Sequence, residues 1–270
     1  MTTVYVDPIL ASAFNSLDAL ISFNGGGSWS GSGRPEQEAF LGKLGALTET
    51  IASLPPGAIE TISARSAGPV NAFLARHGFT GNLREAGPQS LYAAAVLDLL
   101  VEWGTPGSAV SLVLGEGRQV PGVRLKKGQF RVDGRVLSPE VKSGPIRVHM
   151  CESATLDEGL SIITGTWEHL QGDTWGAATF PMVSLDVDVD ASKMIGLRNG
   201  DWTVDQAFAR AKLRLDPKGA HAQAAAAMAA TRSIVKTFKI AGPFTIAFVT
   251  GDGQVAIAYH VTEEHFSAPA

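Results

Sequence analysis

The single cysteine of the chain, Cys151, lies two residues after His149 in the segment IRVHMCES. In a β-strand, residues two apart point to the same face, and a thiol with an imidazole in reach is a pair that nucleophilic catalysis uses. No recognisable cysteine-hydrolase motif surrounds the pair, and a lone buried cysteine is usually inert packing. We therefore predict no catalytic residues. One cysteine also excludes an internal disulfide and a cysteine-based zinc cluster.

Three aspartates, Asp186, Asp188 and Asp190, alternate with apolar residues in LDVDVD. Alternation places their carboxylates on one strand face, where such oxygens can bind Ca²⁺. A row of this kind is more often the solvated face of a half-buried strand, where it also discourages edge pairing. The six histidines show no HExxH spacing. We predict no metal and no cofactor.

The composition is that of a globular protein without a nucleic-acid partner. Apolar residues make up 45% and charged residues 18% of the 270 positions. The net charge is −4, so no overall basic field attracts nucleic acid or anionic lipid. No apolar run is long enough to span a bilayer, and no basic region precedes an apolar stretch at the N-terminus. We expect no membrane partner and a cytoplasmic location.

Helical patterns dominate residues 1–106. Proline at the first turn, apolar residues on one face and closing Gly or Pro residues predict helices over 8–23, from Pro35 to the Pro55-Pro56 stop, over about 69–77, and over about 88–103. Residues 24–33, NGGGSWSGSG, are too rich in Gly and Ser for regular structure.

Residues 107–270 instead have the pattern of strands. Hairpin turns are predicted at GEGR (115–118), VDGR (132–135) and TGDGQ (250–254). Strands are expected over 179–190 and 212–216, with a short helix at ASKMIGL and another after the capping box of Thr203 and Gln206. Helices followed by strands, without a βαβ rhythm, predict an α+β fold with mostly antiparallel sheets in one domain, 1–270.

An alanine-rich run follows the strand at 212–216 and the sequence Pro217-Lys218-Gly219. Eight of the eleven residues from Ala220 to Ala230 are alanine. Since alanine has the highest helix propensity, a packed helix is one interpretation of the run. The other is extended chain whose small side chains can enter a sheet.

The order of segments over residues 177–264 resembles the C-terminal part of the serpins, a family of serine protease inhibitors. ATFPMVSLDVDVDASKMIGLRNG resembles the family's strand followed by an "LG" helix end, and WTVDQAFARAKLRLDPKG resembles the segment that leads to its hinge. The alanine run then takes the place of the reactive loop, and Gly242-Pro243-Phe244 begins the final strands. The resemblance implies a serpin-like fold with an exposed or sheet-inserted reactive loop.

The resemblance also implies which residues act. Gly219 would be the hinge, and Ala220, Ala222, Ala224 and Ala226 would belong to the segment that inserts into the central sheet after cleavage. The bait bond would be Arg232–Ser233. The alternative is that Ser233, one residue later, is the bait residue in place of Arg232. An arginine before the cleaved bond implies a trypsin-like serine protease as partner.

A second function stays open beside protease inhibition. Pro217-Lys218 replaces the acidic hinge of the family, and His221 and Gln223 are large for an inserting strand. Proline fixes φ and lacks an N–H donor, which would hinder insertion. These departures fit a non-inhibitory binding or assembly protein in which the alanine run is fixed structure.

Overall fold

A computed structural model describes residues 3–23, 27–80, 83–86, 90–115, 117–142, 144–166, 175–220 and 236–267. The chain divides into two compact units, each assembled from separate stretches of sequence. Unit 1 contains residues 1–5, 99–187 and 211–270, and unit 2 contains residues 6–98 and 188–210.

Unit 1 contains a six-stranded sheet in the order β1-β19-β18-β10-β9-β8. Its strands are β1 (Thr3–Tyr5), β8 (Phe130–Asp133), β9 (Val136–Pro139), β10 (Arg147–Glu152), β18 (Phe244–Val249) and β19 (Val255–Val261). Every neighbouring pair is antiparallel. The β8–β9 and β18–β19 connections confirm the predicted turns at 132–135 and 250–254. β18 is buried at every residue, which explains its unbroken apolar sequence FTIAFV.

A four-stranded sheet in unit 1 has the order β17-β11-β7-β6. Its strands are β6 (Ser108–Val113), β7 (Gln119–Lys126), β11 (Ala177–Pro181) and β17 (Thr237–Lys239). The β6–β7 hairpin confirms the predicted turn at 115–118. β17 runs parallel to β11, whereas β11 and β6 are antiparallel to β7.

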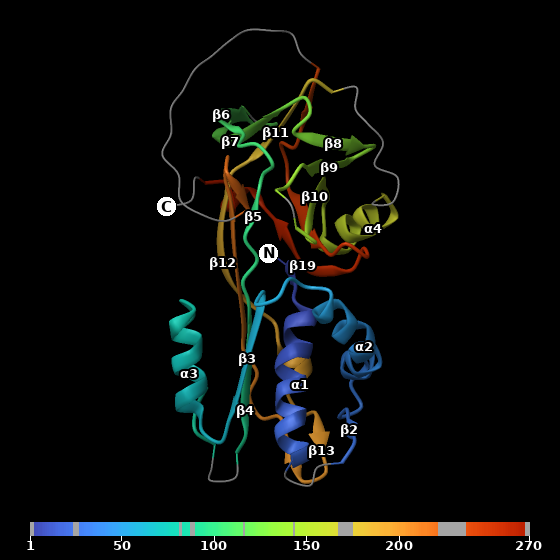
Figure 1. The fold of residues 1–270 in the computed structure, drawn as a ribbon, viewed down its shortest axis with the longest axis vertical. Coiled ribbons are helices and arrows are strands. Elements are labelled where there is room, and N and C mark those ends of the chain that lie inside the picture. Colours follow the sequence, from blue (N-terminus) through green and yellow to red (C-terminus); the bar gives the residue numbers. More distant parts are fainter. Residues whose placement is uncertain are drawn as a thin grey trace. The chain divides into compact units, whose positions relative to one another are not determined.

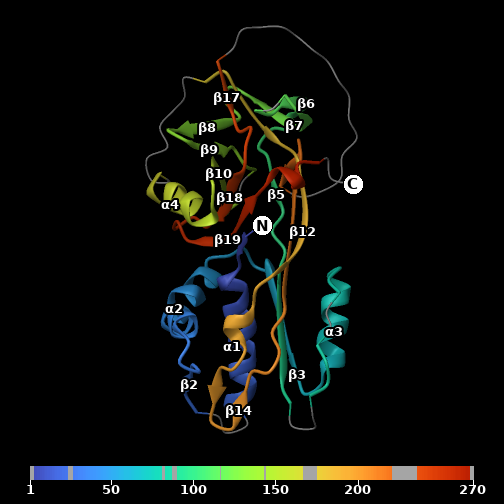
Figure 2. The ribbon, with the colours of Figure 1, turned by 180° about the vertical axis from the view of Figure 1, so that it is seen from behind.

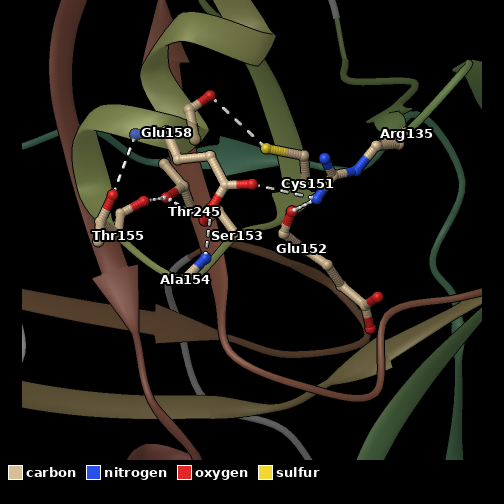
Figure 3. A network of polar contacts seen from close by, with 9 residues as sticks. Arg135, Cys151, Glu152, Ser153, Ala154, Thr155, Glu158 and Thr245 are labelled. Carbon is tan, nitrogen blue, oxygen red and sulfur yellow. Dashed lines mark hydrogen bonds and ion pairs between the residues drawn. The ribbon is translucent and has the colours of Figure 1, made fainter.

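Helix α4 (Leu156–Thr166) packs on β10, β18 and β19 of the six-stranded sheet (Figure 2). The sequence did not predict it, because it contains two glycines and several β-branched residues. Its first turn is fixed by side chains, since Thr155 Oγ1 accepts from the Glu158 N–H at 3.2 Å and Glu158 accepts from the Ala154 N–H at 2.7 Å. Figure 3 shows both contacts.

In unit 2, the strands β3 (Ile59–Ala64) and β4 (Tyr92–Leu97) form an antiparallel pair between helices (Figure 1). The helices are α1 (Asp7–Phe23), α2 (Pro35–Ala52) and α3 (Ala67–Arg76), which confirm three of the predicted helices. The helix predicted over 88–103 is wrong: this stretch contains β4 and, in unit 1, β5 (Val101–Glu102).

Packing on both faces explains why β4 is a strand. α1 and α3 both contact β4, and Tyr92, Ala94 and Val96 join the apolar cluster of α3. By alternation, Ala93 and Ala95 point to the other face, where small side chains let α1 lie close. Pairing with β3 along all six residues then outweighs the helix propensity of the alanines.

The remaining elements form small sheets and 3-10 turns. They are β12 (Val183–Val189), which pairs with β15 (Ala209–Leu215), the small sheet of β2 (Trp29–Ser30), β13 (Arg198–Asn199) and β14 (Trp202–Thr203), the strand β16 (Gly219–Ala220), and 3-10 turns at Ser192–Met194 and Glu263–His265. The helix predicted after Thr203 is wrong, because Thr203 pairs with Arg198 and the Gln206 side chain binds both backbone polar groups of Arg84.

These elements confirm the predicted α+β class with mostly antiparallel sheets. Across the described ranges, no helix has both the length and the apolar character of a membrane span.

Candidate functional site

Gly219, the predicted hinge, and Ala220, the first residue of the predicted inserting segment, form the strand β16, which is antiparallel to β5. Gly219 lies opposite Glu102 and Ala220 opposite Val101, and both Gly219 and Ala220 are buried. A Cβ on Gly219 would lie 2.2 Å from the carbonyl oxygen of Val101. Glycine is therefore required here by the close approach of two backbones, a reason different from the flexibility on which the hinge prediction was based.

A tight turn precedes β16 and is held by Asp216, whose exposed fraction is 2%. Its Oδ1 accepts from the backbone N–H groups of Lys218 at 2.7 Å and Gly219 at 3.2 Å. The Asp216 N–H in turn donates to the Gly219 carbonyl at 2.9 Å. The side chain thus closes an Asx-type turn that reverses the chain from β15 into β16.

Trp103 fixes this turn from the side of β5. Its indole N–H donates to the Asp216 carbonyl at 3.0 Å, and its backbone N–H donates to the Lys218 carbonyl at 2.9 Å. The Gly107 N–H donates to the Pro217 carbonyl at 2.7 Å. The Trp103 ring is 1% exposed and packs edge-on against Phe180. The role of Trp103 is not visible in the sequence, since its hydrogen bonds link residues more than a hundred positions apart.

The chain is anchored again at β17, after the alanine run. The Ile240 N–H, directly after β17, donates to the carbonyl of Thr179 in the middle of β11 at 2.9 Å. Next along the chain, the Glu152 carboxylate accepts from the Ala241 N–H at 2.6 Å and the Gly242 N–H at 3.1 Å. Figure 3 shows the Glu152 side chain pointing away from α4. These contacts fix the chain between β17 and β18.

The remaining predicted site residues lie between these two anchors. Ala222, Ala224, Ala226, Arg232 and Ser233 all fall within 221–235, outside the residues that the structure describes. Their assignments stay predictions. What the structure adds is that β16 and β17, which precede and follow this stretch, are both paired strands.

Cys151 and His149 share β10 but do not form a nucleophile and base. The Cys151 thiol contacts the Gly159 carbonyl at 3.6 Å, and burial raises its pKa to about 12. His149 Nδ1 is bonded to Ser138 Oγ at 2.5 Å, and burial, aided by Arg147, lowers the pKa of the imidazole to about 4. A thiol that stays protonated at neutral pH is not an activated nucleophile, so Cys151 serves as packing.

Because His149 is buried, we expect the protein to lose stability in mild acid. The imidazole has a pKa of about 6.5 when unfolded and about 4 when folded, so between these values the unfolded chain binds the extra proton. Stability is therefore complete above pH 6.5 and falls by roughly 3 kcal/mol as the pH approaches 4. His260, whose pKa burial also lowers, acts in the same direction. Urea unfolding between pH 4.5 and 7.5 measures the slope.

The variant His149→Gln should have a flatter pH dependence over this range. His265→Gln is the matched control, since His265 is less buried than His149 and should leave the wild-type slope in place. If His149→Gln kept the full slope, the assignment to His149 would be wrong.

The three aspartates of β12 and its end take part in separate contacts. Asp186 pairs with Lys212 at 3.5 Å and Asp188 with Arg210 at 3.9 Å, while Asp190 accepts from the Ser192 N–H at 2.8 Å. Among the described residues, no cluster of three or more potential ligands could hold a metal ion. The three aspartates therefore support the pairing of β12 with β15 and the turn at Ser192.

Comparisons with known proteins find structural relatives only. No family model and no curated protein matches the sequence. Solved structures do match over nearly the whole chain. Thyroxine-binding globulin in complex with thyroxine has a TM-score of 0.64 at 12% identity, over 96% of this chain and 92% of the other. The chain has a serpin-like fold.

Two further serpin-fold structures agree. Tengpin, a thermophilic serpin in its native state, has a TM-score of 0.60 at 11% identity over 97% of this chain and 88% of its own. Glycosylated human kallistatin has a TM-score of 0.59 at 14% identity over 100% and 92%. The serpin-like prediction, made from residues 177–264, is thus confirmed for the fold and extends to most of the chain. At these identities the likeness establishes the fold, while activity has to be argued from the residues.

Proposed function

We propose that this chain is a serpin-like protease inhibitor that acts as a suicide substrate, with Arg232–Ser233 as the bait bond and a trypsin-like serine protease as target. The observation that carries the proposal is the pairing of β16. Gly219 and Ala220 already pair with β5 in antiparallel orientation. The residues that follow Ala220 would extend this strand in the same direction.

The register of this pairing specifies how insertion would proceed. Continuing it by two residues would place His221 opposite Leu100 and Ala222 opposite Leu99. The alanines that follow would lengthen the same ladder, with every second side chain turned into the protein. Small side chains suit such a strand because they add main-chain hydrogen bonds without steric clash.

The chemistry would be an interrupted peptide hydrolysis. The protease serine attacks the carbonyl carbon of Arg232, an ester bond to the enzyme forms, and the amine of Ser233 leaves with a proton. Insertion of the freed segment would then carry the bound protease away from the geometry needed for hydrolysis of the ester. Arg232 would select the target by charge-assisted hydrogen bonds to a carboxylate in the specificity pocket.

The test is incubation with trypsin followed by gel electrophoresis in hot detergent. The wild type should form a complex of inhibitor and protease that survives boiling, and the cleaved protein should melt well above the intact one. Ala224→Asp, which puts a charge into the inserting strand, should instead be cut without complex formation. Arg232→Glu should neither be cut at this position nor form a complex.

Clean cleavage of the wild type at Arg232, with no complex and no rise in melting temperature, would refute inhibition. That result would favour the second candidate, a non-inhibitory binding protein. The observation that supports this alternative is the hinge itself, because Trp103, Gly107 and Asp216 hold residues 216–219 through hydrogen bonds that resist movement of Pro217.

A further inference from the structure

Five cationic residues gather on the four-stranded sheet and its strand ends. The sheet's own strands contain no Asp or Glu at any position. We call these residues the basic row: Arg124, Lys126, Lys127, Lys236 and Lys239. In a chain whose net charge is −4, this is a local excess of positive charge.

The pairing register brings the backbones of the basic row close together from segments far apart in sequence. The Lys127 N–H donates to the Gly176 carbonyl at 3.1 Å, and the Gly176 N–H donates to the Lys236 carbonyl at 3.0 Å. Lys127 and Lys236 therefore flank Gly176 on neighbouring strands, with backbones about 10 Å apart. Arg124 and Lys239 flank Thr179 in the same way.

Two members of the basic row, Lys126 and Lys127, differ in their charge partners from several other cations of unit 1. Lys142 pairs with Glu102, Arg135 with Glu158, and Arg118 with Glu263. By contrast, Lys126 and Lys127 are exposed, and no carboxylate in the described part of the chain forms an ion pair with either.

Lys236 is held in place by an aromatic ring. Its Nζ lies 4.3 Å from the centroid of the Trp175 ring, which in turn packs edge-on against Phe238 at 5.5 Å. A cation over a ring face is attracted to it electrostatically. The side chain is exposed, so its charge stays available to a partner while its position is restricted.

We propose that the basic row is an electrostatic docking surface for acidic side chains around the active site of the target protease. This inference rests on the proposed function. The charge of the basic row would select among target proteases in addition to the selection that Arg232 makes. Lys236 follows Arg232 by four residues, a span of at most about 14 Å of extended chain. A protease bound at Arg232 must therefore lie against or beside this surface.

The expected effect is on the rate of association. Complementary charges accelerate encounter by roughly ten to a thousand times, and salt suppresses the acceleration. Anionic and cationic trypsins share a specificity for arginine and differ in net charge, so they form a matched pair of probes. The inhibitor should associate faster with the anionic enzyme at low ionic strength, and the difference should shrink as salt is added.

The deciding variant is Lys126→Glu/Lys127→Glu, which leaves Arg232 and the packing of Lys236 intact. It should slow association with anionic trypsin at least tenfold at low salt and should not slow association with the cationic enzyme. The control is Lys43→Glu/Arg84→Glu, which makes the same charge change at two exposed positions of unit 2 and should change either rate by less than about twofold.

The outcomes separate the two proposals. Complexes that form at rates insensitive to both the variant and salt would overturn the docking surface and leave inhibition standing. Equal slowing by the control variant would also overturn it, because net charge would then explain the effect. If neither trypsin is trapped by the wild type, the proposed function fails and the docking surface with it.

Discussion

Gly159→Ala is expected to destabilise the protein by roughly 3 kcal/mol. Gly159 is in the first half of α4, where the helix lies against β18. A Cβ at this position would be 2.1 Å from Thr245 Oγ1, 2.3 Å from Thr245 Cβ and 2.9 Å from Ser153 Oγ. Thr245 is fully buried and hydrogen-bonded to Ser153, so it cannot rotate away, and the helix would have to lift off the sheet.

The same helix provides the control for this change. A Cβ on Gly165 would meet no atom within 4 Å, so Gly165→Ala should raise stability by up to about 1 kcal/mol through helix propensity alone. Urea unfolding at pH 7 measures both variants. The double variant Gly159→Ala/Thr245→Gly should recover part of the loss, because it removes the atoms that clash. A Gly159→Ala variant as stable as the wild type would show that α4 does not pack this closely.

Trp103→Ala is the second large effect, with an expected loss of about 3–5 kcal/mol. The ring is almost completely buried against Phe180, and its removal leaves a cavity next to the turn at Asp216. Trp103→Phe keeps an aromatic ring but leaves the Asp216 carbonyl without its donor, so we expect a smaller loss of about 1–3 kcal/mol. Trp202→Phe, at a half-buried tryptophan, is the control and should cost less than about 1 kcal/mol.

A second measurement connects Trp103 to the hinge. In Trp103→Phe, hydrogen exchange at the backbone amides of Gly107, Lys218 and Gly219 should accelerate, since these donors hold the turn that Trp103 buttresses. The amides of β18 should keep their protection. Unchanged exchange at the turn would mean that Trp103 contributes packing alone and has no part in fixing the hinge.

The sequence predicted those parts of the fold that local signals determine. Pro35 and Pro55-Pro56 bracket α2, and the Gly-containing turns produce the three predicted hairpins, β6–β7, β8–β9 and β18–β19. It failed where packing outweighs propensity. The alanines of β4 favour a helix in isolation, and the glycines of α4 disfavour one, yet each segment adopts the form that its neighbours require.

The candidate site was predictable only in part. The order Pro217-Lys218-Gly219 followed by alanines singled out Gly219 as the predicted hinge, because this pattern depends on consecutive residues. Trp103 and Glu152 could not be found this way, since their partners Asp216 and Gly242 are distant in sequence and are brought near by the sheets. Nor does a net charge of −4 reveal that five cations share one sheet.

The short strand β16 has a kinetic consequence. When a strand is added to a sheet, forming its first paired residues is normally the slowest stage, since chain entropy is lost before hydrogen bonds compensate for it. These first paired residues are the nucleus of the strand. If the chain inserts as proposed, that nucleus exists before cleavage, because Gly219 and Ala220 are already in register beside β5. After cleavage, β16 would lengthen residue by residue from its paired end. The rate of this lengthening would be set by how fast the sheet opens ahead of the inserting segment. Insertion would therefore compete with hydrolysis of the acyl-enzyme ester without an initial delay for nucleation.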